Sequence, residues 1–394
     1  MRPFWLDELQ QTRAEGNARV RRVLRPDPVN PNRVIWRGRP VLPFASNDYL
    51  GLARDERLAR AALRAIRHEG TGAGASPLVT GWLPSLRALE KDLASLEGAE
   101  KALVFPSGFQ ANLAAISALA GPEDLILSDA LNHASLIDGC RLSRATVQVY
   151  RHGDLEHAND LARTHRSSHR RMLVVTDSVF SMDGDEAPLE GLADLALSHD
   201  GMLLVDEAHA TGVMGPDGRG LAHALLPHFQ REKGKLIRTG TLSKAMGSQG
   251  GFIAGCGSLI RWLVNGARGY LFSTALSPAN AMAARAGLRI ATREPWRREK
   301  VLGLSNLLRA KLAEAGFCLL PGTSPIVPVV LGPSRRAVAW SETLAEAGFL
   351  VPAIRYPSVP RDGARLRITL SAHHHEAEVL ELARELTTLG RSGR

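Results

Sequence analysis

The chain has 394 residues, which is too long for one ordinary core and suits one large domain with one or two smaller ones. Its hydrophobic share of 44% and charged share of 23% are those of a globular protein and exclude a disordered, collagen-like or coiled-coil chain. The net charge of +9 would suit a polyanionic partner, but the arginines are scattered and no recognition motif accompanies them, so we expect no nucleic-acid binding.

No stretch approaches the roughly 18 consecutive apolar residues of a membrane-spanning helix, and the N-terminus has no apolar signal core. We therefore expect no membrane partner and a cytoplasmic location. The isolated cysteines Cys140, Cys256 and Cys318 lack the paired spacing of metal sites or disulfide frameworks. We expect them to be reduced and structural.

Residues 1–45 are predicted to form an N-terminal arm. The pattern indicates an amphipathic helix, then a proline-rich turn (RPDPVNPN), then a short hairpin around VIWRGRPVLPF. Such an arm is expected to pack across another element or another subunit.

Residues 46–290 alternate short apolar runs with helical segments. The strand candidates are KALVF, DLILSD, TVQVY, MLVVTD, MLLVDE, LIRTG and GFIAG. This alternation predicts a large α/β domain in which helices cover both faces of a mostly parallel sheet. Residues 291–394, with helical stretches around strands near PIVPVVL and ARLRITL, are predicted to form a smaller C-terminal α/β domain.

Polar residues just after the apolar runs are site candidates, because ligands bind outside the carboxyl ends of strands in open parallel sheets. Ser107, Gly108 and Phe109 open a helix whose backbone N–H groups could bind a phosphate, although a plain tight turn would look similar. His133 and Ser181 follow two further runs. The flat ring of His133 could stack on a planar cofactor, and the Ser181 hydroxyl could reach a cofactor oxygen or the substrate.

Asp206 ends the run MLLVD, and His209 follows in the tetrapeptide D-E-A-H. A carboxylate at a strand end can keep a ring nitrogen protonated, which makes a pyridinium an electron sink. Taken alone, the two residues also suit a turn cap and a loop histidine. The tetrapeptide is shared with nucleic-acid helicases, but the sequence lacks the phosphate loop G-x-x-x-x-G-K-[ST] that such motors require.

Lys244 lies in TGTLSKAMGSQGGFIAG and is the one lysine with small, nearly uncharged neighbours. A partly desolvated lysine can lose its proton near neutral pH and form a Schiff base with an aldehyde cofactor. Thr241 and Ser243 supply hydroxyls beside it for a phosphate. A buried lysine paired with an acid from elsewhere in the chain is the structural alternative.

The order of the motifs H-A-S-L-I-D-G, D-S-V-F-S-M-D-G-D, D-E-A-H-A-T-G and T-L-S-K, preceded by N-D-Y-L-G-L, resembles that of the α-oxoamine synthases. The resemblance runs from about residue 40 to 385 and implies the transferase fold type I of pyridoxal-phosphate enzymes, with a seven-stranded sheet in the large domain. FASNDYLGL, GAGASPLVTG, FPSGFQAN, FSTALSPA and AIRYPSVPRDGARLRITLSAHH are most similar to the branch of the family that serves biotin synthesis.

By this resemblance, Lys244 would hold pyridoxal 5'-phosphate (PLP) covalently and Asp206 would pair with its pyridine nitrogen. His209 would donate to the ring oxygen, which Ser181 could also reach, and His133 would stack on the ring. Lys244, His133, Asp206 and His209 would form the catalytic group.

The same resemblance implies two sets of phosphate contacts. Those within one subunit would be Gly108, Phe109, Thr241 and Ser243. Ser273 and Thr274 would reach the phosphate of the neighbouring subunit's cofactor, which implies an obligate homodimer with shared active sites.

Matches to substrate-binding positions of the family are Arg21, Asn47, His133, Ser358 and Arg367. Arg367 offers the bidentate fork that suits a carboxylate, and Arg365, two residues earlier, is its rival. Arg19 and Arg22 compete with Arg21 for one role. Ser358 replaces the more usual threonine, and this departure, with Tyr356 in the same loop, leaves the contacts to the acyl group open.

The resemblance implies a decarboxylative condensation of L-alanine with a pimeloyl thioester, carried by coenzyme A or acyl carrier protein, with Lys244 as the base. Sibling synthases of the glycine C-acetyltransferase or 5-aminolevulinate synthase type, and an aminotransferase of the same fold, are the alternatives. We expect no metal site. The run His373, His374 and His375 is predicted to start the last helix after Ser371 rather than to bind a metal, because three adjacent histidines do not share a helix face.

Overall fold

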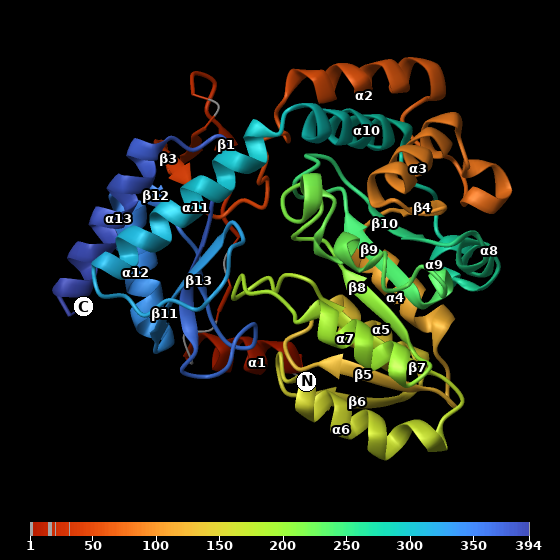
Figure 1. Cartoon of the computed structure of the whole chain (residues 1–394). Helices are drawn as coiled ribbons and strands as arrows, with labels where there is room; N and C mark the ends of the chain where they lie inside the picture. The colour runs from red at the N-terminus through yellow and green to blue at the C-terminus, as the bar shows by residue number, and fades with distance from the viewer. Residues whose placement is uncertain (1–2, 15–17, 20, 31, 394) are drawn as a thin grey trace. The chain divides into compact units, whose positions relative to one another are not determined.

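The computed structural model describes residues 3–14, 18–19, 21–30 and 32–393 (Figure 1). Its contacts divide the chain into two compact units. The large unit comprises residues 50–181 and 186–298, and the second, called here the C-terminal unit, comprises residues 1–49, 182–185 and 299–394. In this division, the segment expected as an N-terminal arm groups with the C-terminal part of the chain.

The large unit is built on a seven-stranded sheet in the order β4-β10-β9-β8-β7-β5-β6. Strand β10 is antiparallel to both of its neighbours, and the other pairs are parallel. The predicted α/β fold with a mostly parallel sheet is therefore confirmed. The strands, each at one of the predicted apolar runs, are β4 (Lys101–Phe105), β5 (Leu125–Asp129), β6 (Thr146–Tyr150), β7 (Met172–Asp177), β8 (Met202–Asp206), β9 (Leu236–Thr241) and β10 (Gly251–Gly255).

Both faces of this sheet are buried, because alternate side chains of its apolar strands point to opposite sides. In β7, Leu173 and Val175 join one core cluster, and Met172 and Val174 join the other. Helices α4, α5 and α8 contribute to the first cluster, and α6 and α7 to the second. The helices of this unit are α2 (Glu56–Glu69), α3 (Pro84–Glu97), α4 (Gly108–Leu119), α5 (Ala134–Ser143), α6 (Leu155–His165), α7 (Leu189–Ser198), α8 (Gly257–Gly266), α9 (Arg268–Leu271) and α10 (Pro278–Arg293).

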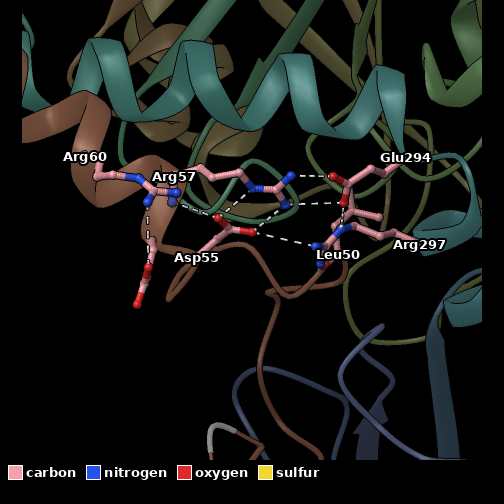
Figure 2. A network of polar contacts seen from close by, with 7 residues as sticks. Leu50, Asp55, Arg57, Arg60, Glu294 and Arg297 are labelled. Atoms are coloured by element: carbon pink, nitrogen blue, oxygen red, sulfur yellow. Dashed lines mark hydrogen bonds and ion pairs between the residues drawn. The ribbon is translucent and has the colours of Figure 1, made fainter.

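An ion network holds together the elements at one end of the large unit (Figure 2). Asp55 is the N-cap of α2, and its Oδ2 lies 2.7 Å from Nη2 of Arg57, which also contacts Glu294 just after α10. Arg297 donates to Glu294 at 2.8 Å and to the Leu50 carbonyl at 2.9 Å. Because Arg297 lies in the first turn of α11 (Trp296–Glu314), the network fixes the points where the chain enters and leaves the large unit.

The C-terminal unit contains two small sheets. One consists of β11 (Ile326–Gly332), β14 (Ala364–Thr369) and β13 (Ala353–Ile354), and the other of β1 (Arg25–Pro26), β2 (Val34–Trp36), β3 (Arg39–Pro43) and β12 (Phe349–Leu350). The predicted N-terminal hairpin is β2 and β3, and β3 also pairs in parallel with β12. The helices are α1 (Phe4–Ala14), most of α11, α12 (Ser334–Glu346) and α13 (Glu376–Arg391).

The histidines of the run His373–His375 have structural roles in packing and helix capping. His374 is buried and stacks on Phe44 with ring centroids 4.0 Å apart. His375 is the N-cap of α13, so the last helix begins just after the histidine run, which was predicted to start it. The described residues hold no group of three or more side chains that could bind a metal ion. Among all the described residues, no helix has the length and apolarity that crossing a bilayer requires.

Candidate active site

Three buried aspartates end parallel strands at the carboxyl edge of the large sheet, Asp129 on β5, Asp177 on β7 and Asp206 on β8. Asp177 lies in register with Asp206. Burial and then the charge of Asp206 raise the pKa of Asp177 well above its usual range, while Lys244 acts in the opposite direction. This edge of the sheet therefore holds a carboxyl pair within electrostatic reach of Lys244.

Asp206 has a hydrogen-bond donor on each carboxylate oxygen. Its Oδ1 accepts from the backbone N–H of Ala208 at 2.8 Å, and its Oδ2 accepts from Nδ2 of Asn112 at 2.6 Å. Donors of this kind favour the charged form of a carboxyl group. Asp206 thus presents a buried carboxyl group with two N–H donors, the kind of group that can pair with a protonated ring nitrogen.

His133 precedes α5 as its N-cap, and its backbone N–H donates to Asp177 at 2.7 Å. The ring Nδ1 lies 2.7 Å from Oγ of Ser135. Although part of the side chain is exposed, desolvation by its surroundings lowers the pKa of His133. The charge of Asp206 opposes this change and that of Lys244 adds to it. Asp206 and Lys244 therefore both lie within electrostatic reach of His133, and the roles of the three residues toward a cofactor stay predictions.

The first turn of α4 lies against the residues just before Lys244. A Cβ atom on Gly108 would come within 3.1 Å of Cβ of Thr241, and a Cβ on Gly251 would come within 2.4 Å of the Gly108 nitrogen. The Thr241 and Ser243 hydroxyls are 2.7 Å apart. Glycine at both positions lets a helix N-terminus approach two hydroxyls, and this combination can bind a phosphate group.

Five other predicted cofactor contacts also lie in the large unit. Phe109, beside Gly108, packs edge to face on His133 with centroids 6.3 Å apart. His209 is buried three residues after β8, and Ser181 is half-buried in the segment after β7. Ser273 and Thr274 lie between α9 and α10, where Ser273 is half-buried and Thr274 is exposed. The roles of these residues toward a cofactor stay predictions.

Two of the predicted substrate residues meet in the C-terminal unit. Arg367, buried on β14, donates through Nη2 to Oδ1 of Asn47 at 3.2 Å. Arg365, its rival, forms an ion pair with Asp183 and donates through Nε to the Gly363 carbonyl at 3.0 Å. The two arginines therefore differ in charge environment, because Arg365 has an acidic partner and Arg367 contacts a neutral amide.

The N-terminal arginines are held in different ways. Arg19 donates to the hydroxyl of Ser358 at 3.4 Å, Arg22 lies over the ring of Trp36 at 5.2 Å, and Arg21 is exposed. Of the three, the structure thus brings Arg19 to Ser358, whereas the sequence favoured Arg21 for the substrate role. Beside Ser358, the ring of Tyr356 is covered by an arginine guanidinium at 4.5 Å.

Sequence reasoning missed three polar residues of this site. Asp177 ends β7 as Asp206 ends β8, so the rule that singled out Asp206 could have found it. Ser135 follows His133 by two residues, and Asn112 is a buried amide in the otherwise apolar stretch of α4. A buried side-chain amide needs partners, but the sequence does not say that its partner is Asp206, which lies 94 residues away.

Comparison with known proteins gives one family. Residues 39–386 match the family model described as aminotransferase class I and II. The 8-amino-7-oxononanoate synthase of Anaeromyxobacter dehalogenans is 48% identical over 374 residues, which cover 94% of this chain and 92% of that protein. Among solved structures, a serine palmitoyltransferase variant with PLP matches with a TM-score of 0.89 at 29% identity, covering 98% of this chain and 97% of the other. The 8-amino-7-oxononanoate synthase of Francisella tularensis matches with a TM-score of 0.77 at 26% identity, covering 90% and 98%.

Proposed function

The chain belongs to the class I and II aminotransferase family, and within that family we propose that it condenses L-alanine with a pimeloyl thioester. The products are 8-amino-7-oxononanoate, carbon dioxide and the free thiol carrier, and the step belongs to biotin biosynthesis. The chain is a PLP-dependent acyltransferase, as its curated relatives and PLP-containing structural neighbours are. The observation that carries the proposal is the grouping of Lys244, Asp206 and His133 at one edge of the sheet.

The residues at this edge fit PLP part by part. Asp206 supplies a buried carboxylate for the ring nitrogen, and Lys244 supplies an amine for the aldehyde. Gly108, packed against Thr241, opens a helix whose N-terminus suits the phosphate. When bound, PLP withdraws electrons from the α-carbon of the amino acid, which makes loss of its proton or carboxyl group possible.

Each of these residues has a defined task in the proposed reaction. Asp206, which accepts two N–H hydrogen bonds, would pair with the protonated ring nitrogen. Lys244 would hold the cofactor through its Nζ and, once released, would serve as the base for the Cα proton of alanine. His133 would cover one face of the ring. These tasks follow from the chemistry of the side chains and their shared position.

Arg367 is our candidate for the carboxylate of the substrate. It matches a substrate-binding position of the family, and its guanidinium contacts the side chain of Asn47. Arg365 instead forms an ion pair with Asp183. The bidentate fork of arginine suits a carboxylate better than a lysine would.

The assembly, carrier and location are further parts of the proposal. Ser273 and Thr274 would contact the cofactor of the neighbouring subunit in a homodimer. Ser358, with Arg19 or Arg21 beside it, would meet the acyl group, which arrives on coenzyme A or on acyl carrier protein. The basic surplus of the chain would attract either phosphate-bearing carrier. We place the enzyme in the cytoplasm.

Absorbance spectroscopy with chemical trapping tests the central claim. Purified protein should show a cofactor band that borohydride fixes to the chain, and Lys244→Ala should bind PLP without that covalent attachment. L-Alanine should shift the band, and pimeloyl-CoA should then release free thiol. A protein that cannot be loaded with PLP would refute the proposal, and amino transfer to a keto acid without thiol release would make the chain an aminotransferase.

A serine-using sibling synthase is the second candidate, because serine palmitoyltransferase is among the structures with the higher TM-score. The same spectrum separates the two. A band that responds to L-serine or glycine but not to L-alanine would keep the family and replace the substrate.

A further inference from the structure

Asn112 stands at the centre of a buried hydrogen-bond network behind the predicted cofactor site. It lies on α4 and is 1% exposed. Its Nδ2 donates to Oδ2 of Asp206 at 2.6 Å and to Oγ of Ser135 at 2.9 Å, and its Oδ1 accepts from Oγ1 of Thr239 at 2.6 Å. The three contacts use both N–H bonds and the carbonyl oxygen of the amide.

The orientation of this amide follows from its partners. If the amide were turned over, its oxygen would face the Asp206 carboxylate at 2.6 Å, and two acceptors would meet in a buried place without a proton between them. An ionised Asp206 therefore requires Nδ2 on its side. The hydroxyl of Thr239 must then donate to Oδ1, which locks the amide from the opposite side.

The orientation of Asn112 determines where the proton of Ser135 goes. Because Oγ of Ser135 receives an N–H from Asn112, its own hydrogen is left for another acceptor, and Nδ1 of His133 lies 2.7 Å away. The backbone N–H of Ser135 points to the same Nδ1 at 3.3 Å. With two donors aimed at Nδ1, a neutral His133 carries its proton on Nε2.

We propose that Asn112 is a positioning residue whose single amide both holds Asp206 as a carboxylate and, through Ser135, fixes neutral His133 with its proton on Nε2. The inference rests on the proposed function only in assuming that Asp206 and His133 face the cofactor. The network would then set two properties of the site together, the negative charge under the ring nitrogen and a hydrogen-bond donor on the stacked imidazole.

The tautomer can be measured in cofactor-free protein by nitrogen-15 NMR of labelled histidine, with His133→Gln identifying the signals of His133. In the wild-type protein at mildly alkaline pH, Nδ1 of His133 should be unprotonated and Nε2 should carry the hydrogen. A wild-type His133 with its proton on Nδ1 would overturn the proposal, whatever the variants do.

Asn112→Asp separates hydrogen bonding from shape. The variant keeps the size of the side chain and the acceptor for Thr239, but it loses both N–H donors and places a second acid beside Asp206. We expect PLP to dissociate about 10- to 100-fold more readily in equilibrium dialysis, the effect of losing a hydrogen bond to a charged group, and the His133 proton to redistribute between its nitrogens. Unchanged PLP affinity and an unchanged tautomer would refute the role of Asn112.

Two more variants distinguish a specific effect of Asn112→Asp on the site from a general loss of structure. Asn159→Leu removes an amide that contacts His199 at 3.3 Å in the same unit and should alter neither PLP affinity nor the His133 signals. Ser135→Ala leaves the contact of Asn112 with Asp206 in place but removes the hydroxyl donor to Nδ1 of His133, so that only the longer backbone contact at 3.3 Å still favours the Nε2 form. It should move part of the His133 proton to Nδ1 with a much smaller loss of PLP affinity. If Asn112→Asp does not fold, the absence of any such shift in Ser135→Ala would contradict the proposed route.

These readouts are independent of the reaction assignment. If L-alanine and pimeloyl-CoA give no product while Asn112→Asp still changes PLP affinity and the His133 signals, the substrate assignment fails and the network stands. If product forms but His133 carries its proton on Nδ1, the network fails and the function stands.

Discussion

The two buried arginines of β14 show that residue type alone does not identify the residue that binds a substrate carboxylate. Arg365 and Arg367 have the same chemistry and lie two residues apart, and the sequence could not choose between them. The structure distinguishes them by partner, because Arg365 forms an ion pair with Asp183 whereas Arg367 donates to the amide of Asn47. The ion pair commits Arg365 to Asp183, so Arg367 is the better candidate for binding an anionic substrate.

This difference predicts opposite phenotypes for two matched variants. Arg367→Gln should raise the KM for L-alanine about 10- to 100-fold, because a charge-assisted contact to the carboxylate is lost, with little effect on stability. Arg365→Gln should leave Asp183, whose side chain is 13% exposed, uncompensated and lower the free energy of unfolding by about 3 kcal/mol. Steady-state kinetics and urea unfolding of both variants check this, and a large KM effect confined to Arg365→Gln would reverse the assignment.

At the same scale, site candidates could be named from sequence where a local rule exists. Asp206 and His133 were singled out because polar residues at strand ends form sites in parallel sheets, and Lys244 because its neighbours are small and nearly uncharged. Asn112 was missed because it belongs to a helix and acts on residues distant in the sequence. Its partners depend on the packing of α4 against β8 and β9, which no local pattern encodes.

At the scale of secondary-structure elements, the contact between β10 and α4 determines the shape of the predicted phosphate site. Gly251 is in register with Phe105 and Thr241, and there is no room for a side chain between it and the Gly108 backbone. The first turn of α4 is therefore positioned by the absence of a Cβ atom on the neighbouring strand.

Gly251→Ala should push the start of α4 away from Thr241 and weaken PLP binding. We expect PLP affinity to fall at least about 10-fold and stability to fall by about 1–3 kcal/mol, as for other overpacked sites. Equilibrium dialysis and thermal unfolding measure the two effects. Gly303→Ala in α11 is the control, because its Cβ meets nothing within 4 Å. It should raise stability by about 0.5–1 kcal/mol, and a similar result for Gly251→Ala would show that the contact is not tight.

The seven strands of the large sheet coincide with predicted runs because most of them are buried on both faces, which demands continuous apolar sequence. The pairing of β3 with β12 was not predictable, since β12 has two residues, Phe349 and Leu350, and lies some 300 positions away along the chain. Short strands with distant partners carry too little periodic signal to reveal their pairing.

At the scale of the whole molecule, the division into units cuts across the sequence. The four residues 182–185 group with the C-terminal unit although both flanks belong to the large unit. Gly184, with φ +74, packs so closely on Ile326 that a Cβ would come within 2.5 Å of its carbonyl oxygen, and Asp183 pairs with Arg365. These contacts are set by tertiary packing, which the motif around D-G-D does not specify.

The two units carry buried titratable groups of opposite kinds. In the large unit, burial raises the pKa of three glutamates to about 7, namely Glu90, Glu97 and Glu207. Their folded forms hold protons that the unfolded chain has released, so this unit loses stability as pH rises from about 4.5 to 7. His133 and His223, whose pKa values are lowered, work against this trend but are outnumbered.

In the C-terminal unit, burial lowers the pKa of His374 to about 4. The folded unit holds this ring neutral, stacked on Phe44 with Nδ1 accepting from the Ser371 N–H at 3.1 Å. Its contribution to stability is complete above a pH of about 6.5 and is lost progressively as pH falls toward about 4. Between about pH 4.5 and about pH 6.5, where the two windows overlap, the stabilities of the two units therefore respond to pH in opposite directions.

Hydrogen exchange followed by mass spectrometry should reveal this opposition. After correction for the intrinsic exchange rate, peptides from β4 and β9 should be better protected at about pH 5 than at about pH 7, and peptides from β11 and β14 should be less protected. Glu90→Gln should reduce the change in the large unit, by up to about 2 kcal/mol of opening free energy, and His374→Leu should abolish the loss in the C-terminal unit. Parallel changes in both units would show that their stabilities are not set by these buried groups.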